Sequence, residues 1–175
     1  MTPHMLLVGS QAVYQRALEE WRTGPLDSTG RSDVAITDDT INGYVNELTR
    51  WAHYLFLPAL RQDYGEGAYQ ITTRAMYSTF PAKETPTQLR ERHLDSGRKA
   101  VIGLWYFKHP DDAAGGDLDL NGLTVPYAEN ALVLFPNTLD AWHSVGPRGA
   151  SLHPRRMINM VGELKAPLHN YRRDI

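Results

Sequence analysis

The sequence of 175 residues contains no cysteine. A disulfide framework, a cysteine-ligated zinc or iron–sulfur site and a cysteine nucleophile are therefore excluded. Any bound metal must be held by histidine and carboxylate side chains, which suit borderline or hard ions. Seven histidines are available as candidate ligands.

The sequence also lacks an excess of charge of either sign. Its 18 Lys and Arg and 20 Asp and Glu residues give a formal net charge of −2. Proteins that bind nucleic acid neutralise phosphates with a basic surface, so we expect no nucleic-acid partner.

Long apolar runs are missing as well. The apolar stretch Met5–Val8 is too short for a secretory signal and far too short to span a bilayer. We therefore expect a cytoplasmic protein with no membrane partner, and the lack of cysteine agrees with that compartment.

The 42% share of hydrophobic residues is ordinary for a globular protein, and the length suits one domain. We expect a single domain over residues 1–175. It comprises a helical front over about residues 1–66, a β-rich core over residues 67–164 and a tail over residues 165–175.

Two helices are predicted in the front part. Apolar residues near helical spacing predict the first over Gln11–Trp21, with Gly24-Pro25 ending it and a loop over Leu26–Asp33. The second begins at the polar residues Thr37–Thr40, which are good N-caps, and ends near Gly65. Pro58 is expected to kink or split this helix.

The β-rich core consists of short apolar runs separated by turn residues, at a spacing typical of a sandwich or barrel. We expect an antiparallel double-sheet jelly roll with the helices on one face and an interior that can hold a ligand. The predicted strands are Ala68–Phe80, Gln88–Asp95, Lys99–Phe107, Asp117–Leu120, Leu123–Tyr127, Ala131–Phe135, Ala141–Val145 and Arg155–Leu164.

One group of side chains in this core suggests metal chemistry. His93 and Asp95 stand two residues apart, so on a strand they share a face. An H-x-D pair alone is also common at exposed strand ends. A second imidazole at His143 would complete two histidines and one carboxylate, the ligand set of non-haem iron(II) oxygenases. The alternative is that His143 is an ordinary loop histidine beside Trp142.

Arg155 opens the last predicted strand. Alternation places Arg155, Met157 and Asn159 on one face and Arg156 on the other. An arginine here can bind a dicarboxylate through paired hydrogen bonds. The alternative is a solvated double-arginine edge that protects the strand from unwanted pairing.

Four segments occur in a recognisable order. Together they resemble the iron(II)- and 2-oxoglutarate-dependent dioxygenases, and most of all the prolyl-hydroxylase-like branch, over about residues 69–164. The segments are HLDSGRKAVIGLWYF (His93–Phe107), GGDLDL (Gly115–Leu120), NALVLFPNTLDAWHSVGP (Asn130–Pro147) and RRMINMVGEL (Arg155–Leu164).

The resemblance implies a mostly β protein with N-terminal helices on a double-stranded β-helix, the cupin-like form of the jelly roll. It implies that His93, Asp95 and His143 bind iron(II), with no catalytic residue beyond these metal ligands. The implied co-substrates are 2-oxoglutarate and dioxygen, with ascorbate as an accessory reductant.

For 2-oxoglutarate, the resemblance implies that Arg155 pairs with the distal carboxylate and leaves Arg156 as the alternative. Family members often carry Ser or Thr two residues after the arginine, where this sequence has Met157. The resemblance assigns the missing hydrogen bond to Tyr106 or Asn159.

The implied reaction is hydroxylation of an unactivated C–H bond while 2-oxoglutarate is converted to succinate and carbon dioxide. The substrate is a polar small molecule, such as an amino acid or a sugar-derived metabolite, or a peptide side chain. Arg74, Tyr77 and Arg90 are the candidate substrate contacts. The alternatives are a non-oxidative cupin-like metal enzyme and a catalytically silent jelly-roll binding module.

The remaining histidines receive ordinary interpretations. His109 and His153 each precede a proline in a predicted turn, and we expect them to be solvated. His53 lies among aromatic residues of the second predicted helix and is expected to pack there.

Overall fold

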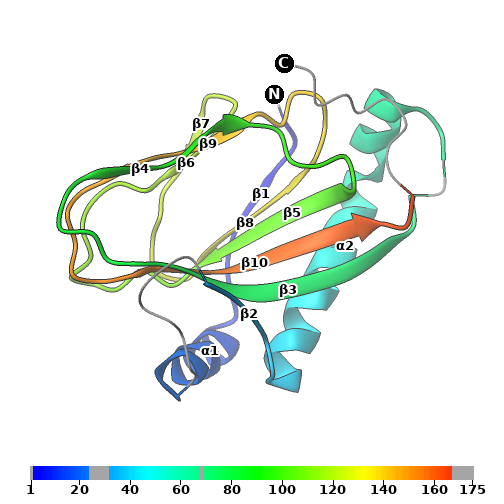
Figure 1. Cartoon of the computed structure of the whole chain (residues 1–175). Helices are drawn as coiled ribbons and strands as arrows, with labels where there is room; N and C mark the ends of the chain where they lie inside the picture. The colour runs from blue at the N-terminus through cyan, green and yellow to red at the C-terminus, as the bar shows by residue number, and fades with distance from the viewer. Residues whose placement is uncertain (1, 24–31, 68, 167–175) are drawn as a thin grey trace.

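The computed structural model describes residues 2–23, 32–67 and 69–166 (Figure 1). In these ranges the chain forms two helices and ten strands, arranged as two antiparallel sheets. Three predicted features lie outside the described residues. They are the end of the first helix at Gly24-Pro25, most of the loop after it, and the tail from residue 167. The elements are β1 Met5–Val8, α1 Gln11–Thr23, β2 Ser32–Ala35, α2 Asp39–Tyr64, β3 Ile71–Phe80, β4 Thr87–His93, β5 Lys99–Tyr106, β6 Leu118–Leu120, β7 Leu123–Val125, β8 Ala131–Pro136, β9 His143–Arg148 and β10 Arg155–Leu164.

The two sheets confirm the predicted jelly roll. The larger has six strands in the order β1-β8-β5-β10-β3-β2, and the smaller has four in the order β4-β9-β6-β7. Neighbours that are distant in sequence, such as β10 between β5 and β3, give the interleaved topology of this architecture. Whether the chain is one domain over residues 1–175 stays a prediction.

Helix α2 covers the outer face of the six-stranded sheet, where it contacts β3, β5, β8 and β10 (Figure 1). Its side chains Ile41, Val45, Ala52 and Leu60 are fully buried in this outer core. A second apolar core lies between the sheets and includes Ile102, Leu118 and Phe135. The space between the sheets is therefore separated from the helices by one complete layer of strands.

The ends of α2 follow from its sequence. The Asp38 carboxylate accepts hydrogen bonds from the backbone N–H groups of Thr40 (2.9 Å) and Ile41 (3.0 Å), which caps the first turn. Gly65 ends the helix with a φ of 88°, a conformation that favours glycine. Pro58 lies inside the helix and does not split it. No helix among the described residues is long and apolar enough to cross a membrane.

The front part is less helical than predicted. It contributes two four-residue strands, β1 and β2, to opposite edges of the six-stranded sheet. Strands this short carry no clear alternation, and they form because β8 and β3 offer a partner edge. The eight predicted strands are all present, but β4 ends at His93 and β9 begins only at His143.

Asn130 joins the first strand to the core. It sits at a φ of 54° and its side chain is buried. Its Oδ1 accepts a hydrogen bond from the Trp105 indole at 2.8 Å, and its Nδ2 donates to the Gly9 carbonyl at 3.0 Å. One side chain therefore satisfies buried polar groups of β5 and of the segment after β1.

Replacing Asn130 by glycine should lower the free energy of unfolding by about 2 kcal/mol, since the Trp105 indole loses its partner. Asn130→Ala should cost about 1 kcal/mol more, because alanine is strained at positive φ. Urea unfolding of the three proteins measures both differences. A glycine variant as stable as wild type would show that these hydrogen bonds contribute nothing.

Candidate metal centre

The pairing of β4 with β9 sets His93 opposite His143. Their ring centroids are 4.3 Å apart. The pairs Arg90–Val145 and His93–His143 enclose three steps along β4 but two along β9, so β4 carries a bulge here. The bulge changes which face the following side chains occupy.

Asp95 completes the cluster from the loop after β4. The prediction that it shares a strand face with His93 is wrong, because the strand has already ended. Its Oδ2 lies 3.6 Å from Nε2 of His143, and the ligand atoms of His93, Asp95 and His143 all lie within 4.8 Å of one another. The three predicted ligands are therefore brought together in space.

A buried amide holds this loop. Asn137, directly after β8, is fully buried, and its Nδ2 donates to the backbone carbonyls of Ser96 and Lys99, both at 3.1 Å. These bonds fix the turn that carries the Asp95 carboxylate. The position of Asp95 thus depends on a residue 42 positions away.

Both histidines are oriented by backbone carbonyls. Nδ1 of His93 lies 2.8 Å from the carbonyl of Glu91, and Nδ1 of His143 lies 3.0 Å from that of Ala141. Because a carbonyl only accepts, Nδ1 carries the proton in each ring and Nε2 keeps its lone pair. Metal-binding histidines are commonly held by this kind of second hydrogen bond.

The protonation states of the clustered side chains suit the binding of a metal cation. Burial lowers the pKa of His143, which keeps that imidazole neutral. Burial raises the pKa of Asp95, but the charge of the Lys99 ammonium and its 2.6 Å hydrogen bond to Oδ1 oppose this effect, and the net shift is downward. A neutral imidazole and an ionised carboxylate are the forms that bind metal ions.

The cluster opens into a cavity of about 160 Å³ between the sheets. Arg155 lines it from β10 and is 1% exposed. Its Nη2 donates to the Gly116 carbonyl at 3.1 Å, Nη1 lies 3.6 Å from Sδ of Met157, and Nε has no partner. No described carboxylate forms an ion pair with it, so the cavity holds a buried cation without a counter-charge.

The other predicted co-substrate contacts lie beside Arg155. Asn159 lines the cavity, and its buried Oδ1 has no hydrogen-bond partner. Tyr106 does not line it, but its ring centroid lies 5.1 Å from the Arg155 guanidinium and its buried hydroxyl is also unpartnered. Arg156, the alternative anchor, is not part of the lining.

Of the three candidate substrate contacts, only Arg90 lines the cavity. Tyr77 is buried on the helix side of the large sheet, where its hydroxyl donates to Glu20. Arg74 is exposed. The register of β3 corrects the Tyr77 prediction, because it directs Ser78 and Phe80 to the cavity and Tyr77 to the opposite face. Arg74 shares the face of Ser78 but lies further along the strand, outside the cavity lining.

Sequence reasoning missed Lys99 and Asn137. Lys99 lines the cavity and neutralises one oxygen of Asp95. Its spacing of four residues from Asp95 was a usable signal, since a short turn brings such residues together. Asn137 gave no local signal because its contacts are made across the fold.

No protein-family model matches the sequence, and no curated protein matches it. Solved structures do match. A viral collagen prolyl hydroxylase from Paramecium bursaria Chlorella virus 1 is 12% identical to this chain, with a TM-score of 0.64. The match covers 93% of this chain and 90% of the viral chain. The chain has the fold of the iron(II)- and 2-oxoglutarate-dependent oxygenases.

Two further structures share this fold. A prolyl hydroxylase from Trichoplax adhaerens, in complex with a hypoxia-inducible-factor peptide fragment, is 17% identical with a TM-score of 0.58, covering 94% of this chain and 85% of its own. A 2-oxoglutarate–iron(II) oxygenase-family oxidoreductase from Burkholderia pseudomallei is 12% identical with a TM-score of 0.56, covering 97% and 86%. Another structure of the viral enzyme is a 2-oxoglutarate complex.

Replacing Lys99 by methionine should raise the pKa of Asp95, because burial then acts without the ammonium that opposes it. A pH titration of the Asp95 carboxyl carbon by NMR measures the shift in metal-free protein. The exposed Lys165→Met variant is the matched control and should leave Asp95 unchanged. An equal pKa in both variants would contradict the role of Lys99.

Proposed function

We propose that the protein is an iron(II)- and 2-oxoglutarate-dependent dioxygenase that hydroxylates a C–H bond of a polar substrate. The observation that carries this proposal is the pairing, in one cavity, of a two-histidine, one-carboxylate cluster with a buried arginine that lacks a counter-charge. The shared fold supports it.

The residues present fit an iron(II) ion. Nε2 of His93, Nε2 of His143 and Oδ2 of Asp95 would hold it, while Lys99 occupies Oδ1 and favours binding through a single carboxylate oxygen. Three ligands on one face leave positions open for other molecules. When bound, iron(II) with 2-oxoglutarate and dioxygen would supply the oxidation of C–H to C–OH, releasing succinate and carbon dioxide.

The residues also fit 2-oxoglutarate. The Arg155 guanidinium would bind its distal carboxylate, since a buried cation with free N–H groups is strongly stabilised by an anion. The Tyr106 hydroxyl and the Asn159 side chain lie beside it as further hydrogen-bonding groups. The aromatic rings of Phe80, Tyr106 and Tyr127 surround the guanidinium and exclude water from this end of the cavity.

Arg90 supports a polar or anionic substrate. Its Nε donates to Nε2 of His93 at 3.0 Å, so its guanidinium reaches the metal cluster itself. A metal ion needs the same lone pair, and its binding would redirect the Arg90 guanidinium toward the open part of the cavity. Substrates that fit are amino acids, sugar-derived metabolites and peptide side chains, and the peptide complex of the Trichoplax enzyme supports the last class.

A substrate panel tests the proposal. Protein incubated in air with iron(II), 2-oxoglutarate and each candidate metabolite or peptide should form succinate, faster with a true substrate, and add one oxygen to it. His93→Ala should abolish both products, because one metal ligand is lost. Absence of succinate throughout would support a non-oxidative metal enzyme or a silent binding module instead. Undiminished succinate in His93→Ala would contradict the proposed metal site.

The two neighbouring arginines provide a matched pair of variants. Arg155→Ala should raise the KM and the dissociation constant for 2-oxoglutarate by about 10- to 100-fold, the loss expected for charge-assisted hydrogen bonds. Arg156→Ala should leave both constants near wild type, because Arg156 does not line the cavity. The reverse result would assign the anchor to Arg156, and Arg155→Lys should give an intermediate loss.

A further inference from the structure

A second group of possible metal ligands lies outside the cavity. The ligand atoms of His109, Asp111 and His153 are all within 4.8 Å of one another, the same limit that the first cluster meets. The two imidazole rings are stacked with centroids 3.8 Å apart and planes 9° from parallel. His109 and Asp111 are exposed and His153 is half-buried, so the group faces solvent.

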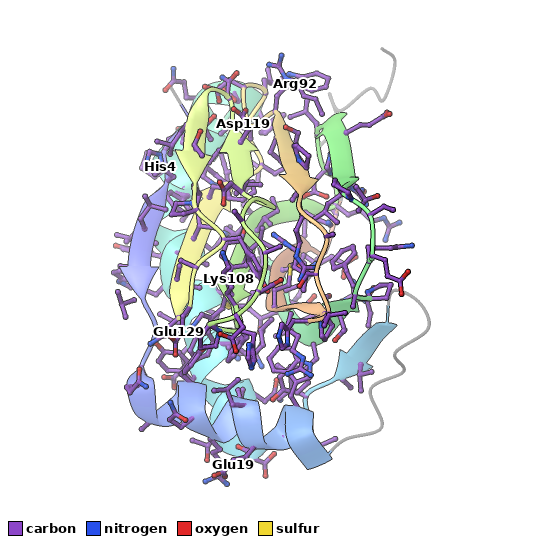
Figure 2. The ribbon with its side chains drawn as sticks, turned by 90° about the vertical axis from the view of Figure 1, so that its left-hand side faces the viewer. His4, Glu19, Arg92, Lys108, Asp119 and Glu129 are labelled. Atoms are coloured by element: carbon purple, nitrogen blue, oxygen red, sulfur yellow. The ribbon has the colours of Figure 1, made fainter. Side chains whose placement is uncertain are left out.

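The group is separate from the first cluster. Lys108 and Arg92, which directly precede His109 and His93, are well apart in Figure 2. His109 and Asp111 come from the connection between β5 and β6, and His153 comes from the connection between β9 and β10. An ion bound here would therefore join two loops that are distant in sequence.

The backbone at both histidines is restricted. His109 and His153 each precede a proline, which disfavours helical conformations for both residues. The carbonyl of His109 accepts from the N–H of Asp112 at 3.0 Å, closing a turn around Pro110. Within that turn, the N–H of Asp111 donates to Nδ1 of His109 at 3.1 Å.

A buried network fixes the two loops to each other directly beside the group. Arg148 forms a buried ion pair with Asp112 and also donates to the carbonyl of His153. Ser151 donates to the Asp112 carboxylate at 2.6 Å and accepts from the N–H of His153 at 3.0 Å. The ligand-bearing backbones are thus tied to one network, so little chain ordering remains when an ion binds.

We propose that His109, Asp111 and His153 form a second, solvent-facing site for a divalent transition-metal ion of the zinc class. Two imidazoles and one carboxylate are ligands that zinc accepts, and solvent fills the remaining position. The stacked rings would turn about their side-chain bonds to face one nitrogen of each toward a common ion. The ion would cross-link the two loops and hold the segment that leads into β10.

Zinc titration of the full chain, stripped with a chelator, tests the site. Because zinc also binds two-histidine, one-carboxylate sites of the first kind, wild type should take up about two ions per chain. The double variant His109→Ala with His153→Ala should take up one fewer and lose part of the zinc-induced rise in Tm. The matched double variant His93→Ala with His143→Ala should keep the ion that the first variant loses.

Asp111→Asn is a milder change at an exposed position. It should weaken the binding of the second ion by about tenfold, because the carboxylate charge is lost. Circular dichroism of each variant shows that the fold is kept. Equal zinc stoichiometry and affinity in wild type and the His109/His153 double variant would overturn the site. Uptake of only one ion by wild type, lost on removing His93 and His143, would overturn it too.

Discussion

The register between β4 and β9 is the constraint on which the candidate metal centre depends. It sets His93 opposite His143, and cross-strand partners project to the same face of a sheet. A slip by one residue would turn either histidine away from the cavity. The bulge before His93 adds a second consequence, because it lets Arg90 and His93 line the same cavity although they are three residues apart.

The six-stranded sheet forms the opposite wall of the cavity, and this wall carries an unusual buried positive charge. Arg155 begins β10, which lies between β5 and β3, so its guanidinium is enclosed by strands and aromatic rings. A cation in such a place is unfavourable unless an anion joins it, and Lys99 already neutralises part of the only carboxylate among the cavity-lining residues. Fold and electrostatics together therefore favour a cavity that binds an anionic ligand beside a metal ion.

Much of this could be predicted from the sequence where the pattern was local. Strict alternation in β10 predicted that Arg155, Met157 and Asn159 share a face, and all three line the cavity. The resemblance selected three ligand residues that the structure brings together. Apolar periodicity also predicted both helices, because α1 and α2 are long enough to show it.

The rest depended on contacts between distant segments. The loop position of Asp95 is held by Asn137, and the inward turn of Arg90 follows from a bulge that only pairing with β9 reveals. Tyr77 was expected at the substrate, yet the pairing of β3 with β10 faces it toward the helices.

The most direct test of the account is anaerobic titration of the protein with iron(II) and 2-oxoglutarate, followed by visible absorption. The account predicts a metal-to-ligand charge-transfer band that requires both components and is lost in His143→Ala. Tight binding of both without such a band would contradict it.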